Sequence, residues 1–213
     1  MQIIGLNTLD LLLLVILLIG LLIGMVRGAV PQLISIVSIW LALFATLWLY
    51  KLFSRNILQG FDMDSVVSDT LSFMLILFVM FHAVRLLVKA LSTPPEERKR
   101  KKKDVDDPLA EAPKTAIERF VFGPLNLTVG MILGVILTTL WLAVILGAMQ
   151  FIFQPSDIPP EVSGFARRMA VQLRNSALLP FFNQVLWLLS ASLNPFIPQN
   201  ADILRDVVRI ISS

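Results

Sequence analysis

Side chains that could do chemistry are few in this chain and lie far apart in the sequence. Its 213 residues contain one histidine and no cysteine. His82 and Arg85 lie about one helical turn apart, so they could share a helix face and respond to a proton or an anion. Arg85 also stands near the end of an apolar run, where an arginine reaches the membrane interface without needing a further function. We therefore interpret the pair as structural.

Acidic residues give no stronger candidate for a catalytic or transport site. A proton relay inside apolar helices would need a buried acid, and the nearest one is Asp10. Asn7 and Asp10 have the spacing of a helix N-cap and its partner, so capping explains Asp10 equally well. The sequence contains no phosphate-binding glycine loop, no pair of catalytic carboxylates and no Ser/His/Asp grouping. We expect a protein that is not an enzyme and holds no cofactor or metal.

The elements that would position such residues are more apolar than those of a soluble protein. Hydrophobic residues make up 56% of the chain and charged residues 15%, against about half and about a quarter in soluble domains. A helix crosses about 30 Å of hydrocarbon in roughly 20 residues. We expect an all-α polytopic membrane protein with about four transmembrane helices and amphipathic C-terminal helices. The expected spans are about 9–27, 30–50, 67–91 and 125–153.

A charged, proline-rich segment separates the third and fourth of these spans. Residues 92–119 have almost nothing to bury, which predicts a solvated linker. Basic residues are concentrated there, so the positive-inside rule predicts a cytoplasmic linker and an N-terminus outside. Six of them could also contact anionic lipid headgroups, whereas nucleic-acid binding would need aromatic or base-reading partners that are missing from the sequence. The six are Arg98, Lys99, Arg100, Lys101, Lys102 and Lys103.

The remaining residues, 154–213, are predicted to form an amphipathic tail beyond the four-helix membrane domain of residues 1–153. We expect this tail to be extracytoplasmic and interfacial. Residues 175–201 lack charge but contain three prolines, so residues 178–194 could be interfacial, re-entrant or a fifth span. Asn183, Ser190 and Asn194 form a polar stripe in this region.

Glycines recur at a four-residue spacing in the first and fourth spans. Glycines at this spacing share one helix face, and in lipid such faces allow two helices to approach closely. We expect a helix contact there, with a substrate passage as the alternative; Asn126 extends the register of the fourth span by one step. The glycines are Gly20, Gly24 and Gly28 in the first span and Gly130 and Gly134 in the fourth.

The order of these motifs resembles the CvpA family, bacterial inner-membrane proteins named for colicin V production. The likeness lies in NTLDLLLLVILLIGLLIGMVRG, in a second span with Trp40, in the basic connection and glycine-bearing fourth span, and in Ser176-Ala-Leu-Leu-Pro180. It covers about residues 1–195. The linker is longer than is usual for the family, and Asn126 stands where a third small residue would be expected. The resemblance implies a link to toxin production or export and to envelope homeostasis, without catalytic residues.

Two functional hypotheses follow from these observations. The first is a noncatalytic membrane accessory protein that packs through its glycine faces, within itself, in a homo-oligomer or against other membrane proteins, and supports toxin production, export or the envelope. The second is a small oligomeric channel or transporter, in which Asn183, Ser190 and Asn194 would line a path. In both, the lipid bilayer is the surrounding partner and nucleic acid is not.

Overall fold

The computed structural model describes residues 6–58, 65–92, 124–153 and 164–196. These residues form helices and no strand, and four of the helices are long and apolar enough to cross a membrane. The four are α1 (Thr8–Arg27), α2 (Ala29–Phe53), α3 (Ser65–Ser92) and α6 (Pro124–Ile152). The expected all-α fold with about four transmembrane helices is therefore confirmed.

Shorter helices complete the described part of the chain. A π-helical turn, η1 (Ser54–Leu58), continues α2, and α7 (Gly164–Arg174) is followed by α8 (Leu179–Leu193) and a 3₁₀ turn, η4 (Asn194–Phe196). Helices α7 and α8 are bent by 82° relative to one another, and as a pair they are apolar enough to count as a broken fifth span or a re-entrant loop. The basic run 98–103 and most of the linker 92–119 lie outside the described residues.

Helix α1 begins and ends at residues whose local chemistry requires it. The side chain of Asn7 accepts a hydrogen bond from the backbone N–H of Asp10, and the Asp10 side chain accepts one from the Asn7 N–H, which together form a capping box. Gly28 ends the helix with φ 77° and ψ 179°, a backbone conformation that is almost restricted to glycine. Helix α2 starts at the next residue, so α1 and α2 form a hairpin with a one-residue turn.

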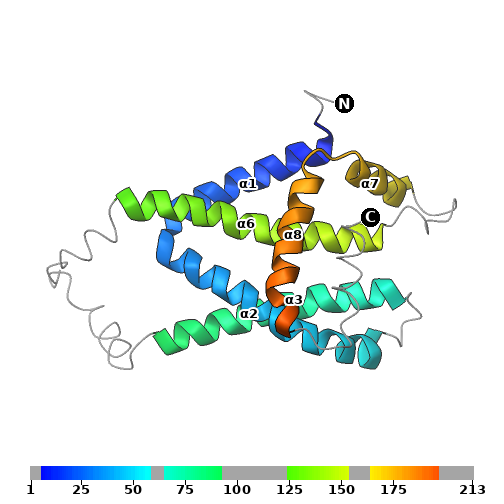
Figure 1. The fold of residues 1–213 in the computed structure, drawn as a ribbon, viewed down its shortest axis with the longest axis horizontal. Coiled ribbons are helices and arrows are strands. Elements are labelled where there is room, and N and C mark those ends of the chain that lie inside the picture. Colours follow the sequence, from blue (N-terminus) through cyan, green and yellow to red (C-terminus); the bar gives the residue numbers. More distant parts are fainter. Residues whose placement is uncertain (1–5, 59–64, 93–123, 154–163, 197–213) are drawn as a thin grey trace, which may run out of the picture.

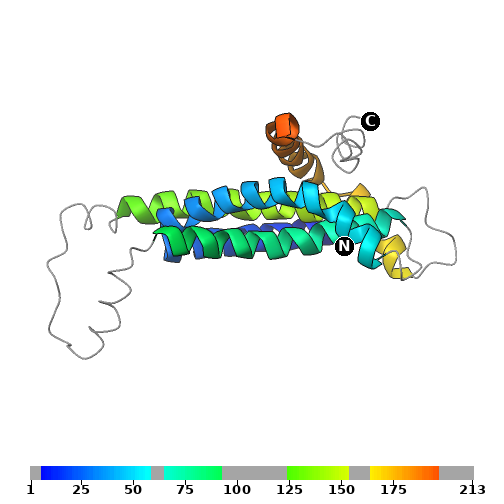
Figure 2. The ribbon, with the colours of Figure 1, turned by 90° about the horizontal axis from the view of Figure 1, so that it is seen from below.

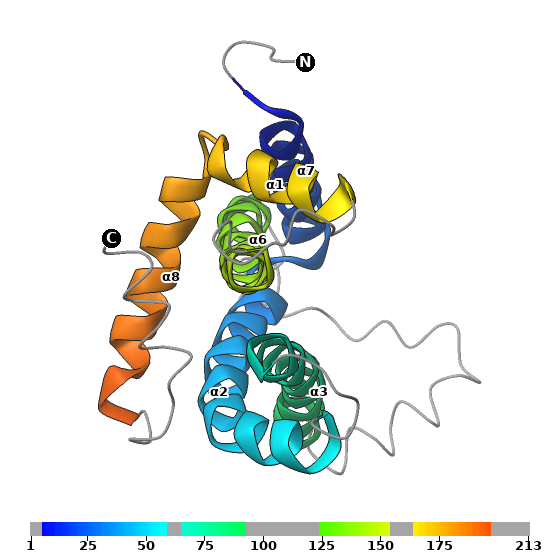
Figure 3. The ribbon, with the colours of Figure 1, turned by 90° about the vertical axis from the view of Figure 1, so that its right-hand side faces the viewer.

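The four long helices lie side by side along the longest axis of the molecule (Figure 1). Helix α1 packs mainly on α6, α2 packs mainly on α3, and α6 also contacts α2 (Figure 3). Many large side chains on the outside are exposed, among them Leu18 at 57% and Val26 at 83%. Such an apolar exterior is the surface that lipid tails would contact, which explains why the sequence shows apolar residues on all sides of these helices.

Helix α8 crosses the bundle on one face instead of running along it (Figures 1 and 2). It packs on α6, where the side chain of Leu186 lies against Gly147. At its far end, the Trp40 indole N–H donates to the Ser192 hydroxyl at 3.2 Å, and Phe196 stacks edge-on against Trp40 with ring centroids 5.8 Å apart. The tail therefore contacts the bundle at several points spread over α2 and α6.

Candidate functional site

The most densely bonded side chain of the described residues is the carboxylate of Asp10, in the first turn of α1. Asp10 is 0% exposed. One of its oxygens accepts hydrogen bonds from the Ser176 hydroxyl at 2.5 Å and the Leu178 N–H at 3.1 Å. The other accepts from the Asn7 N–H at 3.0 Å and the Ala177 N–H at 3.1 Å. All four partners are donors, which fits an ionised carboxylate, a group that only accepts.

Helix α7 completes this arrangement from the other side of the α1 N-terminus. The Asn7 amide group donates to the backbone carbonyl of Gln172 at 2.6 Å, and the Gln172 side-chain oxygen accepts from the Leu9 N–H at 3.1 Å. Two side chains from the tail and two from the α1 terminus are thus joined in one network. We call Asn7, Asp10, Gln172 and Ser176 the Asp10 cluster.

The Asp10 cluster also starts helix α8. The Ser176 hydroxyl oxygen accepts from the Leu179 N–H at 3.1 Å, while Asp10 takes the N–H groups of Ala177 and Leu178. Without intrahelical partners, the first N–H groups of a helix need acceptors, and a negative charge near them is favourable. The carboxylate therefore satisfies donors before α8 while it caps α1, which fixes the angle between tail and bundle.

This geometry suits anchoring better than chemistry at Asp10. Burying an ionised carboxylate is costly unless every acceptor site finds a donor, and the four donors here provide that compensation. A cleft of about 430 Å³ lies beside the cluster, lined in part by Ser176, Asn183 and Trp187, but Asp10 does not line it. The carboxylate is enclosed by its own helix termini.

A second polar group joins α2 to α3 at the same end of the bundle as the Asp10 cluster. The Ser54 hydroxyl lies 3.1 Å from the Ser68 hydroxyl and donates to the carboxylate of Asp69. Helix α3 begins at Ser65, so Asp69 stands inside it. Here too an acid near a helix start accepts a hydrogen bond from a neighbouring helix.

The predicted glycine faces meet in the structure. Gly24 of α1 lies against Gly130 and Gly134 of α6, so closely that a Cβ added to Gly24 would be 2.8 Å from the Gly134 Cα. At the two ends of this contact, Gly20 faces Thr138 and Gly28 faces Asn126, so the helices run antiparallel. We call Gly20, Gly24, Gly28, Gly130 and Gly134 the glycine interface.

Asn126 has a role at the end of the glycine interface that a small residue could not fill. Its side-chain oxygen accepts from the Ala29 N–H at 2.7 Å, the first N–H of α2. The departure from the expected small residue therefore provides an acceptor for the α1–α2 turn. Asn126 joins three helices at this point.

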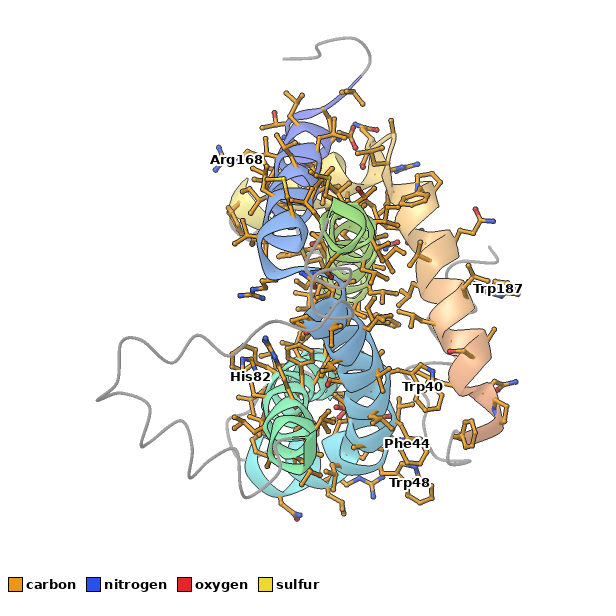
Figure 4. All side chains as sticks on the ribbon, turned by 90° about the vertical axis from the view of Figure 1, so that its left-hand side faces the viewer. Trp40, Phe44, Trp48, His82, Arg168 and Trp187 are labelled. Atoms are coloured by element: carbon orange, nitrogen blue, oxygen red, sulfur yellow. The ribbon has the colours of Figure 1, made fainter. Side chains whose placement is uncertain are left out.

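The three residues of the predicted polar stripe on α8 have different hydrogen-bond partners in the structure. Asn183 accepts from the Gln150 side-chain amide at 2.8 Å, and Ser190 is buried and donates to the Leu186 carbonyl of its own helix at 2.9 Å. Asn194 is exposed at the end of α8. His82 and Arg85 do not pair either: the His82 ring nitrogen Nδ1 lies 2.8 Å from the Phe78 carbonyl, and His82 lies on the outer side of α3 (Figure 4).

The helices and the buried connections between them define a multi-pass α-helical membrane protein. Residues 9–99 match the model of the family described as Colicin V production protein. This part of the chain is a domain of that family, and the predicted resemblance is confirmed. This domain and the apolar helices together support a multi-pass protein of the bacterial inner membrane. No curated protein and no solved structure gives a significant match.

Residues 100–195, over which the resemblance was also expected, lie beyond the matched range. For them the family assignment stays a prediction. Residues 100–195 include Ser176, whose hydrogen bond to Asp10 links the matched domain to the tail. The sequence alone did not predict that these two residues meet, because no spacing or repeat connects Asp10 with Ser176.

Replacing Asp10 with Asn tests the anchoring role. The amide NH₂ would face donors that the carboxylate now accepts, so we expect a loss of about 3 kcal/mol in the free energy of unfolding. The same exchange at Asp69, which is only half-buried, should cost less. Chemical denaturation of the purified protein in detergent measures both. Equal stability of the native chain and the Asp10→Asn variant would contradict the role of the cluster.

Proposed function

We propose that this protein is a noncatalytic membrane protein that supports toxin production or export, or envelope homeostasis, through helix packing and assembly. The observation that carries the proposal is the glycine interface between α1 and α6. Direct backbone contact of this kind specifies how two helices meet, and it leaves no side chain free to react. The buried carboxylate of Asp10 is also engaged in joining α1 to the turn before α8.

The glycine interface favours packing over a substrate passage. A Cβ added to Gly134 would lie 2.5 Å from the Gly20 carbonyl oxygen and 2.6 Å from the Gly24 Cα. A space that cannot hold one methyl group cannot admit a solute between the touching backbones of Gly24 and Gly134. The channel hypothesis would instead need Asn183, Ser190 and Asn194 to share a path, but the first two already form hydrogen bonds within the protein.

The outer side of α8 offers a surface for the assembly part of the proposal. Phe181, Trp187 and Leu188 are 52%, 47% and 56% exposed. Trp187 points away from the bundle (Figure 4). The apolar face of another membrane subunit, either a second copy of this chain or a different membrane protein, would cover these side chains. This exposed surface and the tendency of glycine faces to pack support assembly into an oligomer.

We further propose that the N-terminus lies outside and the linker 92–119 lies in the cytoplasm. The concentration of basic residues in the linker supports this orientation. The Asp10 cluster would then lie at the extracytoplasmic end of the bundle and Arg27 at the cytoplasmic end.

Replacing Gly24 with Leu tests the packing proposal. The larger side chain cannot fit against the backbone of Gly130 and Gly134, so we expect α1 and α6 to separate, with a loss of about 1–3 kcal/mol in stability and impaired assembly, while membrane insertion continues. Gly164→Leu is the matched control, because an added Cβ at Gly164 meets nothing within 4 Å. The measurements are thermal unfolding in detergent and crosslinking in native membranes. A Gly24→Leu variant that is as stable and assembles as well as the control would remove the support for this function.

Orientation is tested by introducing single cysteines at Lys102 and Ser163 into the cysteine-free chain. A membrane-impermeant thiol reagent added outside should label the cysteine at 163 and not the one at 102. After the cells are opened, both should react. Labelling of both positions from the same side would refute the four-span topology.

A further inference from the structure

A cleft lined by both charged and apolar residues lies toward the opposite end of the bundle from the Asp10 cluster. It has a volume of about 200 Å³ and is bounded by α1, α2, α3 and α6. Arg27, the last residue of α1, and Arg85 of α3 line it, and Gln32 in the first turn of α2 lines the same space. None of these residues belongs to the basic run 98–103.

The arginines have no acidic partner among the described residues. Asp10 and Asp69 are the only acids in the described part of the chain, and both stand at the starts of their helices. Helices α1 and α3 run in the same direction, so these acids lie at the far end of the bundle from Arg27 and Arg85 (Figure 1). Two positively charged residues on separate helices therefore line one cleft, and no acid of the described residues lies beside them, which favours an anion between them.

Gln32 gives an independent indication of a ligand. Its side chain is 2% exposed, and its carboxamide oxygen accepts no hydrogen bond from any described residue. A buried acceptor without a donor is costly, and such groups are rare in folded proteins. A ligand that carries a hydroxyl group beside its anion would supply the missing donor.

The remaining lining is mostly apolar, and its two hydroxyl groups, those of Ser35 and Thr138, donate to carbonyls of their own helices. Ile23, Phe81, Leu137 and Trp141 line the cleft, and the rings of Phe81 and Trp141 meet edge to face with centroids 5.0 Å apart. Arg27 stands at the boundary of a candidate membrane span, where headgroups lie, and the apolar walls extend from there into the bundle. A ligand with a phosphate, a hydroxyl and an apolar portion matches a cleft that is charged at the membrane boundary and apolar further inside, whereas a free phosphate would leave the apolar walls uncovered.

We propose that this cleft binds the headgroup of an anionic, hydroxyl-bearing phospholipid, with the phosphate between Arg27 and Arg85 and a headgroup hydroxyl donating to Gln32. The proposal goes beyond helix packing, because it assigns a lipid site to this end of the bundle. Phosphatidylglycerol has this chemistry. Soluble glycerol 3-phosphate shares the phosphate and hydroxyls but lacks the acyl chains, so it distinguishes a lipid from a soluble ester.

The test is native mass spectrometry of the full-length protein in detergent, titrated with phosphatidylglycerol, phosphatidylcholine or glycerol 3-phosphate. We expect phosphatidylglycerol to bind more tightly than the other two by about tenfold or more, and the double variant Arg27→Gln, Arg85→Gln to lose that preference. Gln32→Leu should weaken the binding of phosphatidylglycerol and leave the binding of phosphatidylcholine unchanged. Lipid-free melting temperatures show that each variant is folded.

Two control variants separate the cleft from general surface attraction. Arg55→Gln removes an exposed arginine at the other end of the bundle, and a variant with glutamine at positions 98–103 removes the basic run. Both should bind phosphatidylglycerol as the native chain does. Equal binding by the double variant, or an equal loss in either control, would overturn the site. Tighter binding of glycerol 3-phosphate than of phosphatidylglycerol would overturn its assignment to a lipid.

Discussion

The need to satisfy a buried carboxylate governs how this chain is put together. Asp10 is completely buried at one end of the bundle, where the protein excludes water, so its four donors must come from the protein. Three of them belong to the turn between α7 and α8. The position of the tail therefore depends on one side chain near the beginning of the chain. Helix α8 can cross the bundle because its starting point is held there.

Apolar packing alone would not specify this architecture. The four long helices are apolar on the inside and on the outside, so burial of hydrophobic area distinguishes poorly between alternative arrangements. Specificity comes from features that fit in only one way: backbone contact at the glycine interface, the Asn126 acceptor for the α1–α2 turn, and the Asp10 cluster. The first two position α1 against α6, and the third adds the tail. The colicin V production domain, residues 9–99, thus depends for its packing on helices that follow it in the sequence.

The helical class and the number of spans could be predicted because the length of an apolar run is a local property of the sequence. The contact between Gly24 and Gly130 could be predicted for a similar reason, because glycines at a four-residue spacing mark one face on each of the two helices. The contact between Asp10 and Ser176 was not, because 166 residues separate them and neither has a periodic pattern. The polar stripe of α8 shows the opposite difficulty: a regular spacing suggested a common role for Asn183 and Ser190, but Asn183 bonds to Gln150 of α6 and the Ser190 hydroxyl bonds to the Leu186 carbonyl of its own helix.

The position of α8 across α6, which follows from its attachment at the Asp10 cluster, can be measured directly. In the cysteine-free chain, the pair Gly147→Cys and Leu186→Cys would join the two helices where the Leu186 side chain lies against Gly147. Mild oxidation in native membranes should form this disulfide readily. The pair Gly147→Cys and Leu188→Cys should stay reduced, because Leu188 is exposed on the outer side of α8. Equal crosslinking of both pairs, or crosslinking of the second pair only, would contradict a fixed position of α8 across the bundle.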